Sequence, residues 1–258
     1  MSAVTQAPSR RRPSRAARAG FHVLGIVGEL LITLGLLIAG FLVWQLWWTD
    51  VVADKAQAQI VEELPWAVAA PIVPPKDLPA DEIAVAQPRH DEPPAEPVPA
   101  HAQSVATLTV PRWDATAARP ISEGTDRATV LDVLGIGHYE GTALPGGIGN
   151  FAVAGHRTTY GKPFNRIEEL QVGDPLVVRT ALAWYVYRVT SWRIVPPHEV
   201  DVIAPVPGDP GATPTRRMIT LTTCHPMFSA RERYIVHGEL DYWAPADGAF
   251  PAELLPAA

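Results

Sequence analysis

The chain has 258 residues, a single cysteine and a formal net charge of −6, and 19% of its residues are charged. Residues 1–20 contain five arginines and no acidic residue, so the rest of the chain is clearly acidic. Because an acidic surface repels a polyanion, this balance argues against nucleic acid as a partner.

Residues 21–48 are typical of a membrane-spanning helix. They carry one charged residue, Glu29, and end in a tryptophan cluster of Trp44, Trp47 and Trp48 that suits a membrane interface. A helix of this length spans about 42 Å, which exceeds the hydrocarbon core of about 30 Å. A cleaved signal peptide is the alternative, but its apolar core is shorter, about 7–15 residues.

The arginines predict the orientation of this helix. Positive charge stays on the cytoplasmic side, so residues 1–20 are expected to form a cytoplasmic basic arm. We therefore predict a single-pass protein of the cell membrane, in contact with the lipid bilayer through residues 21–48 and extracytoplasmic beyond them.

Residues 49–103 predict a short polar helix followed by a proline-rich linker. Ten prolines stand between residues 65 and 99, with many acidic residues and little apolar periodicity. Such a segment buries too little apolar surface to form a core, so we expect an extended spacer between the membrane and the next domain.

Residues 104–245 predict one all-β domain, followed by a C-terminal tail, residues 246–258. Many short strands separated by Gly and Pro turns are typical of a barrel or a sandwich. Short helices are expected only at 129–134 and 165–170. The expected strands are 106–110, 150–155, 175–179, 184–189, 192–195, 218–222 and 234–240.

The lone cysteine, Cys224, is the first candidate for chemistry. An exported protein with one thiol forms no intramolecular disulfide, so Cys224 is a buried small residue, an intermolecular cross-link or a nucleophile. Cysteine-based acyl transfer also needs a histidine and a donor for the developing oxyanion. His156 follows a predicted strand, and Arg233 begins the strand after the Cys224 loop, so both are candidates for these roles.

Three segments around these residues resemble the sortase family. Thr220–Cys224 is similar to the sortase nucleophile motif, Ala152–Arg157 to its histidine segment and Arg231–Val236 to its arginine strand. Their order along the chain also fits, and the similarity covers roughly residues 105–242. The Thr-Thr-Cys-His-Pro form, together with Gly137–Tyr139, most resembles the class E housekeeping group of high-GC Gram-positive bacteria.

The resemblance implies a closed eight-stranded β-barrel and a cysteine transpeptidase. Sortases cleave a C-terminal sorting signal between Thr and Gly, hold the secreted protein as a thioester, and pass it to an amine of a peptidoglycan precursor. For this chain the resemblance implies Cys224 as nucleophile, His156 as acid and base, and Arg233 as the substrate and oxyanion contact. A Leu-Ala-x-Thr-Gly or Leu-Pro-x-Thr-Gly type of signal is expected.

Three further residues are candidates for substrate binding: Thr223 beside the nucleophile, Tyr139 in the expected substrate loop, and His225 as a residue that shapes the pocket. Arg231 is the nearest competitor of Arg233. Adjacent cysteine and histidine lack the usual spacing of metal ligands, so no metal and no cofactor is predicted.

Three other functions stay open as alternatives. An L,D-transpeptidase also uses cysteine, histidine and arginine, but its usual Ser/Thr-His-Gly-Cys signature differs from Leu221–Cys224. A pilin-polymerising sortase often carries a lid and a C-terminal membrane helix, and neither is evident here. A non-catalytic, membrane-tethered module that binds the cell wall would leave Cys224 dispensable.

Overall fold

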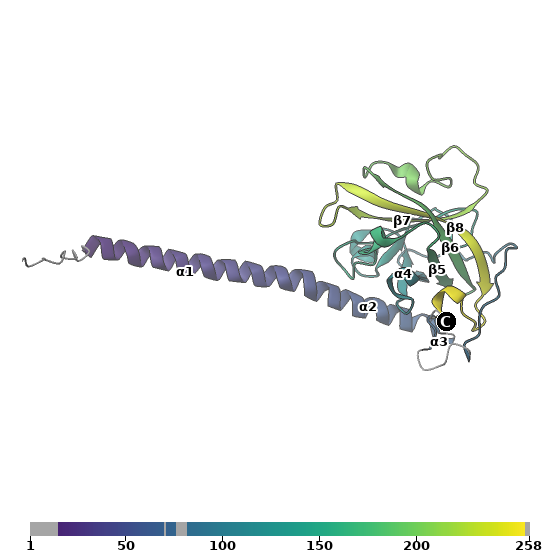
Figure 1. The fold of residues 1–258 in the computed structure, drawn as a ribbon, viewed down its shortest axis with the longest axis horizontal. Coiled ribbons are helices and arrows are strands. Elements are labelled where there is room, and N and C mark those ends of the chain that lie inside the picture. Colours follow the sequence, from purple (N-terminus) through teal and green to yellow (C-terminus); the bar gives the residue numbers. More distant parts are fainter. Residues whose placement is uncertain (1–14, 70, 76–81, 256–258) are drawn as a thin grey trace, which may run out of the picture. The chain divides into compact units, whose positions relative to one another are not determined.

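The computed structural model describes residues 15–69, 71–75 and 82–255 (Figure 1). The chain divides into two compact units, residues 1–48 and 49–258.

The first unit contains one long helix. α1 (Arg15–Val43) is followed by a π-helical turn, η1 (Trp44–Trp48). Within α1, the segment Leu24–Val43 has a mean hydropathy of 2.4 and is long and apolar enough to cross a membrane. The apolar helix expected at 21–48 is therefore present, whereas most of the predicted basic arm lies outside the described residues.

Within the described residues, eight strands form a closed barrel, which confirms the predicted fold class. The strands are β1 (Ser104–Thr109), β2 (Arg119–Glu123), β3 (Ile136–His138), β4 (Gly149–Ala154), β5 (Pro175–Thr180), β6 (Ala183–Val195), β7 (Arg217–His225) and β8 (Glu232–Pro245). Around the barrel they are ordered β1-β2-β3-β4-β7-β8-β6-β5. The pairs β2/β3 and β4/β7 are parallel, and the other neighbours are antiparallel.

Short helices connect and flank these strands. The two helices expected at 129–134 and 165–170 are present as η3 and η4, although both are shorter and begin at different residues. The helices of the second unit are α2 (Thr49–Glu63), α3 (Pro65–Ala69), α4 (Pro111–Asp114), η3 (Arg127–Leu131), η4 (Ile167–Glu169), η5 (Val200–Ile203) and η6 (Ala252–Leu254).

The alternating side chains of β6 explain why the barrel has apolar groups on both of its surfaces. Tyr185 and Tyr187 point into the main core of the barrel, whereas Trp184 and Val186 belong to a second cluster. Successive strand residues face opposite sides of a sheet, so a run that is apolar at every position needs cover on both.

The proline-rich segment provides part of this second cover, and its interpretation as a free spacer is wrong for residues 82–99. Ile83 and Ala86 are buried in the second cluster. The backbone of Arg89 exchanges both hydrogen bonds with Trp243 of β8, at 2.8 and 3.0 Å. Proline cannot donate a ladder hydrogen bond, so this segment forms no regular strand. The apolar residues that lie between its prolines are nevertheless buried against the outer surfaces of β6 and β8.

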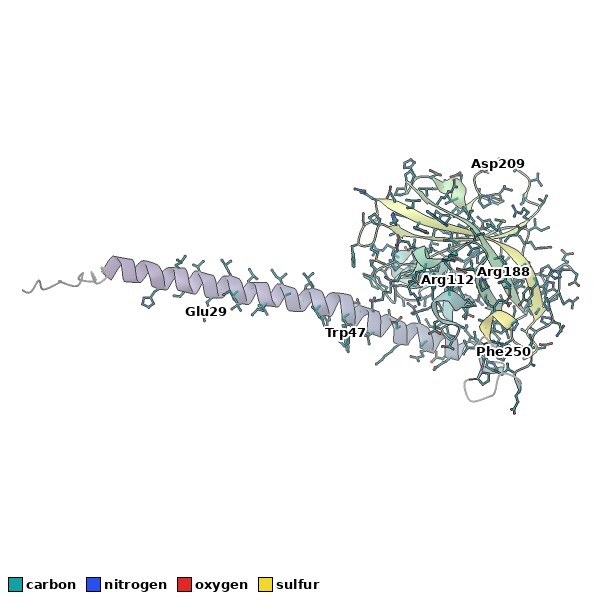
Figure 2. The ribbon with its side chains drawn as sticks, in the orientation of Figure 1. Glu29, Trp47, Arg112, Arg188, Asp209 and Phe250 are labelled. Atoms are coloured by element: carbon teal, nitrogen blue, oxygen red, sulfur yellow. The ribbon has the colours of Figure 1, made fainter. Side chains whose placement is uncertain are left out.

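The described part of the C-terminal tail also packs against this outer surface. Phe250, which is labelled in Figure 2, and Leu254 are buried in the second cluster by their exposed fractions, and the Phe250 carbonyl accepts a hydrogen bond from the Ala86 amide at 2.8 Å. The tail and the proline-rich segment therefore form one joint cover over β6 and β8.

Candidate active site

The topology of the barrel brings the three predicted catalytic residues together. β4 and β7 are parallel neighbours, with Ala154 opposite Thr222, so His156 and Cys224 both follow at the same end of the sheet. β8 runs antiparallel to β7 and places Arg233 directly opposite Cys224. A cavity of about 500 Å³ is lined by all three residues.

Cys224 is a free, partly exposed thiol at the end of β7. Its position on a strand fixes the direction of the side chain, because Cys224 is held in the β7/β8 ladder opposite Arg233. Partial exposure beside positive groups is the environment in which a cysteine acts as a nucleophile.

His156 is held by a carboxylate that sequence reasoning missed. Its Nε2 atom lies 2.6 Å from Oδ1 of Asp132, and the two side chains are 15% and 21% exposed. A carboxylate on Nε2 keeps the proton on that nitrogen and leaves Nδ1 for proton transfer. The only signal for Asp132 in the sequence was its place in an expected short helix, 24 residues before the histidine.

The other side of the His156 ring is covered by Tyr160. The two ring centroids are 5.1 Å apart, with an interplanar angle of 35°. The Asp132 hydrogen bond fixes the direction in which Nε2 of His156 points, and the Tyr160 ring limits rotation of the imidazole plane.

Arg233 lies at the cavity wall, and its side chain is tied to its own loop. Nη1 donates to the carbonyls of Ala230 and Glu232, at 2.9 and 3.0 Å. Two backbone bonds on one nitrogen leave other guanidinium donors for a substrate carbonyl. Arg231, the competing residue, is exposed and does not line the cavity.

A second arginine, Arg157, lies buried behind the nucleophile and was also missed. Its Nη1 donates to the Cys224 carbonyl at 3.4 Å and to Nδ1 of His225 at 3.1 Å. Its Nη2 lies 2.8 Å from Glu168, an ion pair without the alignment of a hydrogen bond. Arg157 therefore supplies a fixed positive charge that also supports the Cys224 loop.

The aromatic ring of Tyr234 completes this support. The Arg157 guanidinium lies 5.7 Å from the ring centroid, and the His225 ring packs against it at the same distance. Burial, and next the negative charge of Glu168, raise the pKa of Tyr234, so its hydroxyl remains protonated.

Two of the three predicted substrate-binding residues line the cavity. Thr223 donates from its hydroxyl to the Gly155 carbonyl at 2.7 Å, which links β7 to the histidine loop. The Tyr139 hydroxyl lies 3.0 Å from Oγ1 of Thr222. His225 is not part of the cavity lining and instead contacts Arg157 and Glu168.

Within residues 15–69, 71–75 and 82–255, no group of three or more histidine, cysteine or acidic side chains has the arrangement of a metal site.

Comparison with known proteins places this barrel and its cavity in a family. The family model described as a sortase domain matches residues 108–241. Sortase SrtE1 of Streptomyces coelicolor is 36% identical over 255 residues, which cover 95% of this chain and 65% of that protein. The chain thus spans slightly less than two thirds of the length of that relative. Sortase SrtE2 of the same organism is 33% identical, over 93% of this chain and 89% of its own length.

Solved structures agree with these relatives. The SrtA sortase from Actinomyces oris is 43% identical with a TM-score of 0.62, over 66% of this chain and 98% of that one. The crystal structure of sortase E1 from Streptomyces coelicolor with a tripeptide in the active site is 38% identical with a TM-score of 0.54, over 60% of this chain and 100% of that one. The chain therefore belongs to the sortase family of cysteine transpeptidases.

Proposed function

We propose that this chain is a membrane-anchored transpeptidase that attaches secreted proteins to the cell wall. In this proposal it cleaves a C-terminal sorting signal of the Leu-Ala-x-Thr-Gly or Leu-Pro-x-Thr-Gly type between Thr and Gly. The observation that supports the proposal most directly is that Cys224, His156 and Arg233 line the same cavity, in a chain of this family.

The first half of the reaction forms a thioester. Cys224 attacks the threonine carbonyl as a thiolate, with its proton carried by His156, and a C–S bond forms. As the C–N bond to glycine breaks, His156 gives that proton to the departing amine. Arg233 donates to the carbonyl oxygen while negative charge develops on it.

The second half of the reaction transfers the acyl group. The amine of a peptidoglycan precursor attacks the thioester carbonyl, a new amide bond forms, and the C–S bond breaks. His156 accepts the proton that the attacking amine loses, and Cys224 departs as the thiolate, which frees it for the next signal.

The cavity suits a peptide segment of a few residues. Its lining combines the polar Thr223 and Tyr139 with the exposed ring of Phe228. A tripeptide occupies the active site in the crystal structure of sortase E1 from Streptomyces coelicolor. By similarity, we assign the sorting signal to the corresponding cavity here.

Attachment to the cell wall is favoured over pilin polymerisation as the outcome of the transfer. Among the described residues of 49–103, none lines the cavity, so none of these described residues forms a lid over it. An open site is accessible to a bulky cell-wall precursor.

The proposal assigns a place to each part of the chain. The catalytic domain comprises residues 104–245, with the described parts of 82–103 and 246–258 packed against it. Residues 21–48 cross the membrane with residues 1–20 in the cytoplasm, so the catalytic domain lies outside the cell membrane, on the side of the cell wall.

The direct test uses the full-length chain in detergent micelles with a fluorogenic sorting peptide and an added amine. We expect cleavage between Thr and Gly, a product in which the amine replaces glycine, and a thioester on Cys224 detected by mass spectrometry. Cys224→Ala is expected to abolish all three. A folded protein that leaves both types of signal intact would contradict the proposal and favour a non-catalytic wall-binding module.

A further inference from the structure

Helix α2 (Thr49–Glu63), which follows the apolar helix directly in sequence, contacts the barrel through polar side chains. Asp50, Asp54 and Gln57 are spaced i, i+4 and i+7, so they lie on one face of the helix. We call these three residues the α2 contact face. A helix that served only as an anchor would be expected to bury apolar groups, but Ala53 is the one apolar residue of α2 that is buried.

Gln57 is the centre of this face and is fully buried. Its Nε2 donates to the Tyr160 carbonyl at 3.0 Å, and its Oε1 accepts from Arg119 at 3.2 Å. Its amide group also fills the space beside Gly135 and Gly161, where an added Cβ would approach it to 2.9 and 2.8 Å. The barrel thus has a closely fitted place for this one side chain.

Asp50 and Asp54 strengthen the same contact. Asp50 is buried, accepts from the Gly161 amide at 3.3 Å and pairs with Lys162 at 2.8 Å. Asp54 pairs with Arg119 at 2.6 Å. Gln57 and Asp50 therefore bind three consecutive residues, 160–162, two of them through backbone groups.

These three residues have a backbone conformation that needs such support. The φ angles of Tyr160, Gly161 and Lys162 are +54°, +76° and +36°. Two of the three carry a Cβ atom, for which the left-handed region is unfavourable, and such residues persist where surrounding contacts hold them.

This supported loop carries the ring that covers the catalytic histidine. Tyr160 packs on His156 with centroids 5.1 Å apart, and its backbone carbonyl is the group that Gln57 binds. Tyr160 thus contacts both α2, through its carbonyl, and the His156 ring, through its side chain.

We propose that α2 is a positioning element for the active site: through Gln57 and Asp50 it holds the 160–162 loop, and through Tyr160 it fixes the orientation of His156. The proposal rests on the proposed function for its effect on turnover. It makes the segment next to the apolar helix part of the catalytic unit rather than a passive stalk.

The test compares three variants of the full-length chain in detergent micelles. Gln57→Ala and Asp50→Asn weaken the α2 contact face, and Gln59→Ala is the matched control, because Gln59 is exposed and bonds only to Glu63 on its own helix. We measure two quantities: the rate at which diethyl pyrocarbonate modifies His156, located by mass spectrometry, and the kcat and KM for a sorting peptide.

We expect Gln57→Ala to raise the modification rate severalfold, because Tyr160 no longer covers the ring. We expect kcat to fall by about five- to tenfold with KM changed less than about twofold, since one lost hydrogen bond misplaces the acid and base. Asp50→Asn should act in the same direction, and Gln59→Ala should match the wild type. Should Gln57→Ala not fold, Asp50→Asn, which retains Gln57, carries the comparison.

Equal modification rates in the weakened variants and in Gln59→Ala would overturn the proposal. So would a raised modification rate with an unchanged kcat, because the loop would then be held without consequence for catalysis. If the wild type cleaves no sorting peptide, the proposed function fails, and the modification rates still decide whether α2 orders the His156 environment.

Discussion

Asp132 accepts a hydrogen bond from Nε2 of His156 over 2.6 Å, although the two residues lie on different connections of the barrel. Asp132 follows η3 directly, and His156 follows β4. This hydrogen bond adds a carboxylate to the proposed active site and leaves Nδ1 as the ring nitrogen available for proton transfer.

Asp132→Asn should lower kcat/KM by about 10- to 100-fold, because an amide no longer selects one tautomer of the imidazole. Asp132→Glu should restore part of the loss, since it returns a carboxylate. Steady-state kinetics with a sorting peptide measure both. Asp209→Asn serves as control, because Asp209 is an exposed carboxylate outside the cavity lining; an equal loss there would contradict a specific role for the Asp132–His156 bond.

Arg233→Ala should lower kcat/KM by about 10²- to 10³-fold through the loss of an oxyanion donor. Arg231→Ala, two residues earlier and outside the cavity lining, should stay near the wild type. The comparison of kcat/KM for the two variants identifies the functional arginine. A larger loss in the Arg231 variant would reverse the assignment.

His237 should make the fold sensitive to acid. Burial, and next the positive charge of Arg193, lower the pKa of His237 to about 4, while Asp201 opposes this shift. In the unfolded chain the pKa returns to about 6.5, so between these values the unfolded state binds the extra proton. Stability is complete above pH 6.5 and falls as the pH drops towards 4, by about 3 kcal/mol for this group.

Denaturant unfolding of the wild type and His237→Asn at several pH values measures the contribution of His237 to the free energy of unfolding. Asparagine keeps a donor for Thr220, whose Oγ1 lies 2.9 Å from Nδ1 of His237, but does not titrate. The stability difference between the two proteins should therefore shrink from pH 7 to pH 4. If the difference in free energy of unfolding between the two proteins is the same at every pH, titration of His237 does not affect the stability of the fold.

Ala86→Asp should destabilise the catalytic unit by about 2–4 kcal/mol, because it places a charge in the apolar cluster between β6 and the C-terminal segment. The melting temperature should then fall by about 5–10 °C. Ala84→Asp is the matched control, since Ala84 is exposed two residues earlier. If residues 82–99 were a free spacer, both substitutions would have the same small effect.

The strands of the barrel were predictable because their side chains alternate or are continuously apolar over short runs. The segment Trp184–Val189 predicted a strand, and β6 contains it. Cys224, His156 and Arg233 were proposed as site residues because each follows or begins such a strand within a recognisable motif, and the structure places them around one cavity. Local pattern and short motifs were therefore sufficient to predict most of the strands and the three residues that share this cavity.

The contacts that the sequence did not predict join segments far apart in the chain. The contacts of Asp132 with His156 and of Arg157 with Cys224 depend on how η3 and the loop after β4 pack. The spacing of apolar residues along the chain does not predict such packing. Ile83 and Ala86 were hidden among prolines, because composition indicates whether a segment forms its own core but not whether it covers another. Gln57 was similarly one polar residue in a polar helix until its buried partners were known.

The parallel pairing of β4 with β7 separates the geometry of the reaction from the length of the chain between the two strands. His156 and Cys224 are spaced by the register of one ladder, so the length of the connection from Val195 to Arg217, which carries Asp209 (Figure 2), does not set their separation. Lengthening a loop costs little free energy, because the closure entropy grows only slowly with the number of residues. The exposed stretch 208–211 of this connection is therefore where we expect an inserted segment to be tolerated without moving His156 relative to Cys224.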